Sequence, residues 1–175
     1  MSNTFTGVFP VNEMDFTIDK ASETARSSSP SYVTIADMES ASVAIDTGVE
    51  TWNPLESKGW QRALATAKGM TISMSGKRNV GDAGNDYVAG KAFKNGQACN
   101  STYKIKFPNG DTLEVPCVIQ VKSLAGADST NVAPLEFDLI SDGKPTYTTA
   151  SGVTTSDSGS SSEINAENQN DQPEG

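Results

Sequence analysis

Hydrophobic and polar residues alternate along several short segments of this 175-residue chain. From Met70 to Met74 every second residue is apolar, and Leu135, Phe137 and Leu139 alternate with acidic residues in the same way. Alternation with a period of two is typical of a strand that buries one face. The pattern predicts strands over 16–18, 32–35, 42–46, 49–52, 70–75, 101–107, 112–121 and 134–140.

Glycine and proline mark the breaks between these strands. Thr47-Gly48 predicts a tight turn. The stretch 53–68 contains Pro54 and Gly59, and we interpret it as a long irregular connection. An irregular loop of this length inside a small domain is unusual and tends to be functional.

One segment has the spacing of a helix instead. The sequence predicts a short helix over 85–95, with Asn85 as the N-cap, Asp86 in the first turn and Gly96 at the C-terminal end. The expected apolar stripe of this helix comprises Val88, Ala89, Ala92 and Phe93.

The two cysteines are predicted to stay reduced because of the hairpin that follows the helix. Keeping its apolar faces together across the Asn109-Gly110 turn would place Cys99 opposite Val121, about four residues along the ladder from Cys117. The same register pairs Phe107 with Leu113, Ile105 with Val115, and Tyr103 with Cys117.

Together these elements predict a mainly β fold, an antiparallel β-sandwich or small barrel with one flanking short α-helix. We expect three regions along the chain. These are an N-terminal arm over 1–31, a β-sandwich domain over 32–148, and a disordered acidic C-terminal tail over 149–175.

The charge of the chain is −9, from 22 acids and 13 bases. Five of the acids lie beyond Thr148, which leaves 17 acids against 13 bases in the body. This balance argues against a dedicated nucleic-acid binder, which needs clustered Lys and Arg. No export signal and no long apolar run is visible, so we expect a protein made in a cytoplasm and not inserted in a membrane.

The sequence contains few residues in patterns that would indicate a catalytic or metal-binding site. The chain has no histidine, which removes Ser-His-Asp, Cys-His and His-metal sites. The run from Gly81 to Asp86 is acidic and glycine-rich but lacks the ligand spacing of an EF-hand, so a turn with a helix cap is the stronger interpretation. Glu136 and Asp138 are expected on a solvated strand face. We therefore predict no enzyme activity, no cofactor and no metal site.

Three longer segments of the chain add to this interpretation through their resemblance to a known family. The segments are GKRNVGDAGNDYVAG, DSTNVAPLEF and the upstream DMESASVAIDTGVETWNPLESKGWQRALATAKG. Across 32–148 the sequence closely resembles the tail tube (major tail) proteins of long-tailed bacteriophages. The resemblance implies a β-sandwich with a flanking helix.

The resemblance also implies a structural role in the virion. Six copies would close into a ring, and rings would stack into the non-contractile tail tube that conducts viral DNA into the host. Assembly would take place in the bacterial cytoplasm. The implied partners are other copies of the chain, a tape-measure protein, a tail terminator and a distal tail protein. DNA would pass without specific binding.

Within this family, contacts between rings are expected from the stretch 53–68. Trp60 is flanked by charged and polar residues, as buried interface anchors often are. The candidate inter-ring contacts are Trp60, Leu64, Leu55 and Arg62. Trp52, at a predicted strand end, could equally be a core residue.

Charged residues supply the remaining candidates. Lys77 and Arg78 are expected to form ion pairs, either with a neighbouring subunit or with Asp82. Glu114 and Glu136 are candidates for the lumen wall, on an inner sheet built from 101–121, 42–52 and 70–75. The alternative function is a monomeric β-sandwich binding module for a carbohydrate or a host-surface ligand.

Overall fold

The computed structural model describes residues 5–21 and 29–152 of the chain. Most of the predicted acidic tail, 153–175, lies outside these described residues. The elements in chain order are η1 (Val11–Glu13), β1 (Asp15–Asp19), β2 (Tyr32–Thr34), β3 (Met38–Trp52), η2 (Leu55–Ser57), β4 (Arg62–Lys77), α1 (Ala83–Ala89), η3 (Gly96–Cys99), β5 (Asn100–Lys106), β6 (Thr112–Ser123), β7 (Pro134–Ser141) and β8 (Thr146–Thr148).

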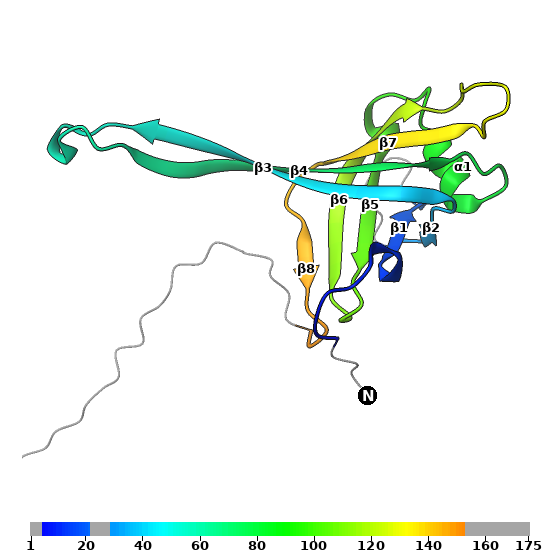
Figure 1. The fold of residues 1–175 in the computed structure, drawn as a ribbon, viewed down its shortest axis with the longest axis horizontal. Helices are drawn as coiled ribbons and strands as arrows, with labels where there is room; N and C mark the ends of the chain where they lie inside the picture. The colour runs from blue at the N-terminus through cyan, green and yellow to red at the C-terminus, as the bar shows by residue number, and fades with distance from the viewer. Residues whose placement is uncertain (1–4, 22–28, 153–175) are drawn as a thin grey trace, which may run out of the picture.

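The strands form one antiparallel sheet in the order β2-β1-β5-β6-β7-β4-β3, and β8 pairs with the start of β6. Figure 1 shows β3, β4 and β7 crossing the view while β5, β6 and β8 run down it, so the sheet bends strongly between its two halves. The short helix α1 lies at one end of the sheet. The mainly β fold with one short helix, predicted from alternation, is confirmed. Strand β1 lies within the predicted N-terminal arm and pairs with β5.

The core fills the concave side of the bend. Alternate residues of β5 and β6 face those of β4 and β7, and Tyr103 bridges the two halves by donating from its hydroxyl to the sulfur of Met74 at 3.0 Å. The core residues are Ile18, Ile35, Ile72, Met74, Val88, Ala89, Tyr103, Ile105, Val115, Cys117, Ile119, Leu135, Phe137 and Leu139. Removing these apolar side chains from water is the main driving force for the fold.

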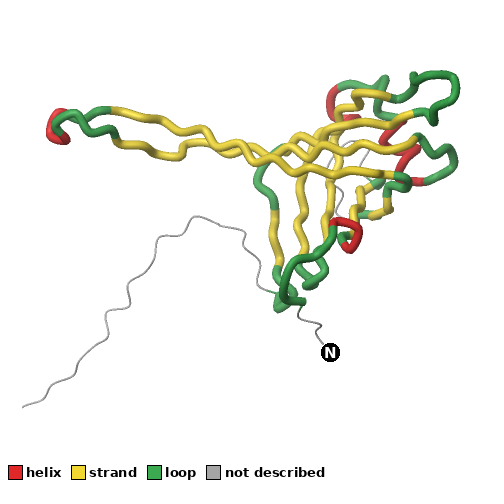
Figure 2. The backbone as a smooth tube through the Cα atoms, in the orientation of Figure 1, coloured by secondary structure: helices red, strands yellow, loops and turns green. Residues whose placement is uncertain are grey.

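The predicted turn at Thr47-Gly48 is wrong, and the irregular connection predicted over 53–68 covers only 53–61, because 62–68 belong to β4. Strands β3 and β4 pair without a break from the body out to Trp52 and Arg62, with a β-bulge at Gly48. Figures 1 and 2 show the two strands leaving the body as a long hairpin. Beyond the body both faces of this hairpin are exposed, so no apolar alternation marks it in the sequence.

The observed helix is also shorter than the helix predicted over 85–95. Helix α1 begins after Asp82, whose side chain accepts a hydrogen bond from the backbone N–H of Asn85 at 2.7 Å. Asn85 is therefore a buried residue of the first turn and not the cap. The helix ends at Gly90, so the expected apolar stripe stops at Ala89. Phe93 is 90% exposed.

The predicted hairpin register is wrong by two residues. Tyr103 pairs with Val115 and Ile105 with Leu113, because the tight turn closes with the backbone N–H of Gly110 donating to the carbonyl of Phe107 at 2.9 Å. A shift of two leaves the same residues on the core face, so alternation alone cannot detect it. The expected pairing partner of Cys117 changes to Ser101, and both cysteines are free and buried.

Candidate assembly surfaces

Several exposed large apolar side chains lie on the outer part of the β3–β4 hairpin, which we call the arm (residues 46–67). Leu55 is 98%, Trp60 81% and Leu64 59% exposed. Val49 is exposed as well, although the sequence indicates only an ordinary strand over 49–52. Clusters of large exposed apolar side chains mark interaction sites in soluble proteins. The structure thus brings three of the predicted contact residues, Trp60, Leu64 and Leu55, onto one projecting element.

The fourth residue, Arg62, organises the aromatic side chain next to it. Arg62 pairs with Trp52 at the outer end of the ladder between β3 and β4. Its guanidinium carbon lies 5.6 Å from the centre of the Trp52 ring. Stacking of this kind is a favourable cation–π contact. Trp52 is 42% exposed and lies on the arm, so it is not a core residue.

Local hydrogen bonds shape the tip of the arm, where η2 follows Pro54. The hydroxyl of Ser57 lies 2.8 Å from the carbonyl oxygen of Pro54 and 2.6 Å from that of Trp60. Lys58 and Gly59 both have a left-handed backbone, with φ of 49° and 93°. Glycine tolerates this conformation without strain. The tip is therefore a defined turn that holds Trp60 at the far end of the molecule.

The segment from Lys77 to Asp86, which joins the end of β4 to α1, forms a corner of the body and not an exposed site. Lys77 pairs with Glu39 at 3.4 Å, and Arg78 pairs with Asp86 at 2.6 Å. The hydrogen bond from Arg78 lowers the pKa of Asp86 below its usual value. Asp82 caps α1 and is not among the partners found for the two bases. A role for these residues between subunits stays a prediction.

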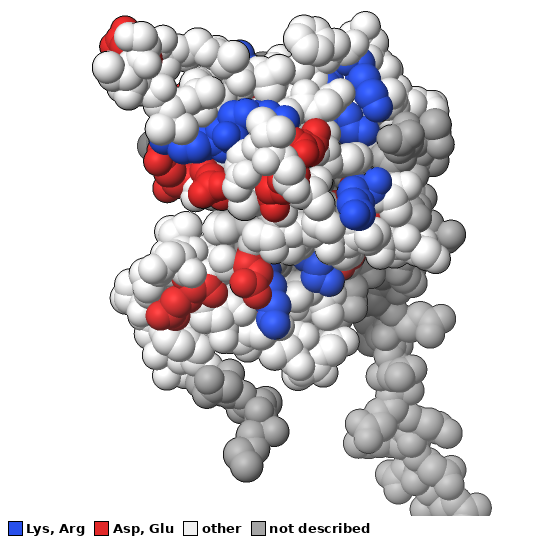
Figure 3. Space-filling view, turned by 90° about the vertical axis from the view of Figure 1, so that its right-hand side faces the viewer, with Lys and Arg blue, Asp and Glu red and all other residues white. Residues whose placement is uncertain are grey.

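The convex face of the sheet, opposite the core, is polar. Lys104 pairs with Glu114 at 2.8 Å and Lys122 pairs with Asp138 at 2.6 Å, whereas Glu136 is exposed. Figure 3 looks at the end of the molecule where α1 lies, and acidic and basic side chains lie interspersed there as well. Bases that are paired with acids, as Lys104 and Lys122 are, add little to the attraction of a phosphate backbone.

Two other kinds of site are absent from the described part of the chain. Residues 5–21 and 29–152 contain no group of three or more His, Cys, Asp or Glu side chains placed to hold a metal ion. No helix within these ranges is long and apolar enough to cross a membrane.

A bent antiparallel sheet with a projecting apolar hairpin and a polar convex face defines a structural protein with surfaces for association. The chain belongs to the phage tail tube protein family, whose model matches residues 16–147. It is thus a structural, non-enzymatic component of the tail of a phage-like particle. No curated protein sequence matches the chain significantly.

Solved structures show the same fold at low sequence identity. The tail of an empty gene transfer agent particle, refined with C6 symmetry, has a TM-score of 0.64 and 18% identity, covering 81% of this chain and 99% of that one. The tube-terminating cap of the anti-feeding prophage gives a TM-score of 0.54 and 16% identity over 83% and 94%. A sheath–tube complex of an extracellular contractile injection system gives 0.52 and 13% over 83% and 95%.

Proposed function

We propose that six copies of this chain close into a ring and that the rings stack into a hollow tube for viral DNA. The six-fold tail of the similar gene transfer agent supports this symmetry. Strands β2 and β3 end the sheet order, so each subunit carries two edges with unpaired backbone groups. Pairing such edges around a closed ring turns an aggregation hazard into an assembly contact.

The arm is the observation that carries this proposal. This two-stranded hairpin has both faces in water, and Trp60, Leu55 and Leu64 on it are left uncovered by the described part of the chain. Isolated hairpins of this kind are marginally stable in water. Burying the arm against the next ring would stabilise it and join the rings. The family match favours this function over the alternative of a monomeric binding module.

The polar convex face would form the lumen wall. It carries Glu114 and Glu136 among paired charges, so it would give DNA phosphates no basic residues in excess. The protein would then act as a passive conduit in a non-contractile tail. A tape-measure protein, a tail terminator and a distal tail protein would be the partners at the ends and in the lumen.

The test is to remove the two apolar anchors of the arm. The double variant Trp60→Ala/Leu64→Ala should remain a folded monomer but lose the ability to form tubes, as seen by negative-stain electron microscopy. Val80→Ala is the matched control, because Val80 is equally exposed but lies on the body. Long tubes from the double variant would show that the arm is not the contact between rings.

The acidic tail has a separate proposed role on the outside of the tube. Its five carboxylates repel those of neighbouring copies and would slow premature association. Deleting 150–175 should therefore accelerate tube growth, measured by light scattering. Unchanged growth rates would remove the tail from the assembly mechanism.

A further inference from the structure

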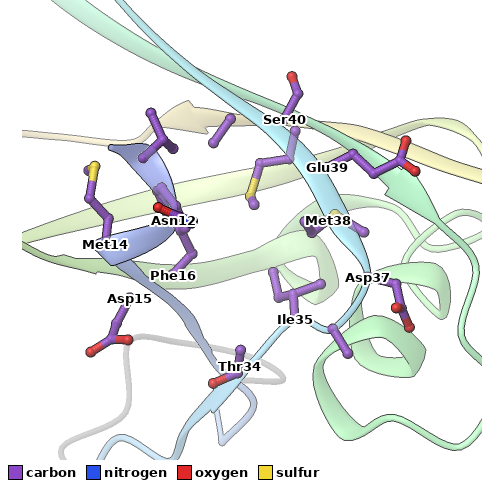
Figure 4. Close-up of a pocket in the computed structure, with 14 residues that line it drawn as sticks. Asn12, Met14, Asp15, Phe16, Thr34, Ile35, Asp37, Met38, Glu39 and Ser40 are labelled. Atoms are coloured by element: carbon purple, nitrogen blue, oxygen red, sulfur yellow. The ribbon is translucent and has the colours of Figure 1, made fainter. Parts of the chain in front are cut away.

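A hollow of about 380 Å³ opens in the body between η1, β1 and the start of β3. Its apolar lining includes Met14 and Phe16, which Figure 4 shows on the side of η1 and β1, and Ile35 and Met38, which it shows on the side of β3. Methionine side chains adapt their shape to what they bind. The volume lies in the range of pockets that hold small ligands or single large side chains.

The rim of this hollow is acidic. Asp15, Asp37 and Glu39 line its mouth, and their carboxylates point outward in Figure 4. Lys77 pairs with Glu39 and offsets one of the three negative charges. The hollow therefore suits an apolar group that has positive charge beside it.

Two other hollows in the described part of the chain have the opposite charge. One, beside η3, is lined by Lys91 and Lys94. The other, at the base of the arm, is lined by Lys68 and Lys144. Electrostatic complementarity selects among surfaces that are similar in shape, because like charges brought together repel.

We propose that the acidic hollow receives the arm tip of a second copy of this chain, with Trp60 as the inserted side chain. Lys58 and Arg62 lie two residues to either side of Trp60, closer to it in the chain than the acidic Glu56 of the same tip, so the two bases would face the acidic rim. Trp and Arg are the residue types that most often dominate binding energy at interfaces. This inference rests on the proposed function, since it names the surface that the arm contacts.

The shape of the subunit supports a second copy as the occupant. Figures 1 and 2 place the arm tip at the far end of the molecule from β1, so the tip does not reach its own hollow. A knob and a hole at different places on one chain make a head-to-tail contact, which propagates from copy to copy. The C-terminal segment of the chain is a poor competitor, because its five acids beyond Thr148 would meet an acidic rim.

A disulfide cross-link tests the contact directly. Asn12 lines the hollow and Gln61 follows Trp60, and both are exposed. The full chain with Asn12→Cys and Gln61→Cys is assembled and oxidised, then run on a denaturing gel without reductant. We expect a ladder of covalent multimers, at least tenfold more abundant than in the control. Native Cys99 and Cys117 do not interfere because both are buried.

The matched control is Gln97→Cys with Gln61→Cys, because Gln97 lines the hollow beside η3 that carries lysines. Mixing the two single variants Asn12→Cys and Gln61→Cys should give covalent dimers and no ladder, as a head-to-tail contact requires. Tubes that form without the Asn12 cross-link, or that cross-link through Gln97 instead, would overturn this inference and leave the proposed function intact. Failure of the wild-type chain to form tubes would overturn both.

Charge reversal gives a second readout. Lys58→Glu should slow tube growth about tenfold at low salt, and adding Glu39→Lys should restore most of the rate. The slowing should shrink as salt screens the charges. A Lys58→Glu chain that assembles at the wild-type rate at low salt would contradict the proposed contact with the acidic rim.

Discussion

The Nη1 atom of Arg78 lies 2.8 Å from Oδ1 of the buried Asn85, and this hydrogen bond fastens α1 to the end of β4. The same oxygen accepts a hydrogen bond from the backbone N–H of Asn79 at 3.1 Å. The Nδ2 atom of Asn85 donates to the carbonyl oxygens of Ala36 at 3.1 Å and Lys77 at 2.9 Å. One buried amide thus uses its full hydrogen-bonding capacity and joins three segments of the chain.

Replacing this amide should be costly. Asn85→Ala leaves the buried partner groups without their hydrogen bonds, and each unsatisfied buried group costs about 1–3 kcal/mol. We expect the free energy of unfolding to fall by about 3 kcal/mol. Urea denaturation of the unassembled protein, followed by circular dichroism, measures the change. Asn95→Ala is the control, because Asn95 is exposed and makes no side-chain capping bond, and a loss as large there would contradict this assignment.

Gly84, in the same corner, permits a close approach of two backbones. A Cβ atom at Gly84 would lie 2.2 Å from the carbonyl oxygen of Thr34, which is backbone and cannot swing aside. Gly84→Ala should therefore lower the free energy of unfolding by about 3 kcal/mol, at the upper end for overpacked sites. Gly69→Ala is the matched control, since nothing lies within 4 Å of its Cβ position. Equal melting temperatures for the two variants would show that α1 and β2 can move apart freely.

The sequence predicted the strands that bury one face, because burial on one side imposes the alternation seen around Ile72 and Phe137. It predicted the strand over 49–52 but missed the outer half of β4, where both faces meet solvent and Ala63 to Ala67 show no contrast of apolar and polar positions. The polar and charged residues that flank Trp60 correctly indicated an exposed side chain, and its role as an interface anchor stays a prediction. The acidic hollow could not be foreseen, because its lining comes from segments that only the fold brings together.

The ion pair between Lys122 and Asp138 makes the free energy of unfolding depend on pH. Burial raises the pKa of Asp138, but hydrogen bonds from Lys122 and Ser73 outweigh burial and bring the pKa below its usual value. A lowered pKa in the folded state stabilises the fold above the pKa of the unfolded chain. This stabilisation is lost as the pH falls through the folded-state pKa. We expect the free energy of unfolding to decline from about pH 5 to pH 2.

Asp138→Asn removes the charge and should reduce this decline. The variant should lose about 1.5–3 kcal/mol at neutral pH, the range for a hydrogen bond to a charged group. It should then lose less than the wild type on acidification, as followed by denaturation at a series of pH values. Glu136→Gln, on the same strand but exposed, is the control and should change little. Parallel acid profiles for Asp138→Asn and the wild type would show that the Lys122 pair contributes nothing.

The lumen assignment predicts how charge on the convex face affects the passage of DNA. Six copies of Glu136→Lys would place a ring of positive charge at each level of the tube. The affinity for the phosphate backbone of DNA increases with the number of basic residues that contact it. Ejection from particles carrying the variant should be several-fold slower than from the wild type, and the delay should shrink at higher salt. The exposed position of Glu136 means that folding and assembly should be preserved.

Two further variants separate the electrostatic attraction of DNA to the lumen wall from other causes of slower ejection. Glu136→Gln removes the acid without adding a base, so its ejection rate should stay close to that of the wild type. Glu114→Lys tests the second candidate, but it also breaks the 2.8 Å pair with Lys104, so its stability has to be measured alongside. A delay that persists at high salt would point to a steric cause. Wild-type kinetics for either lysine variant would place that residue outside the lumen wall, because a positive ring in contact with DNA cannot leave its passage unchanged.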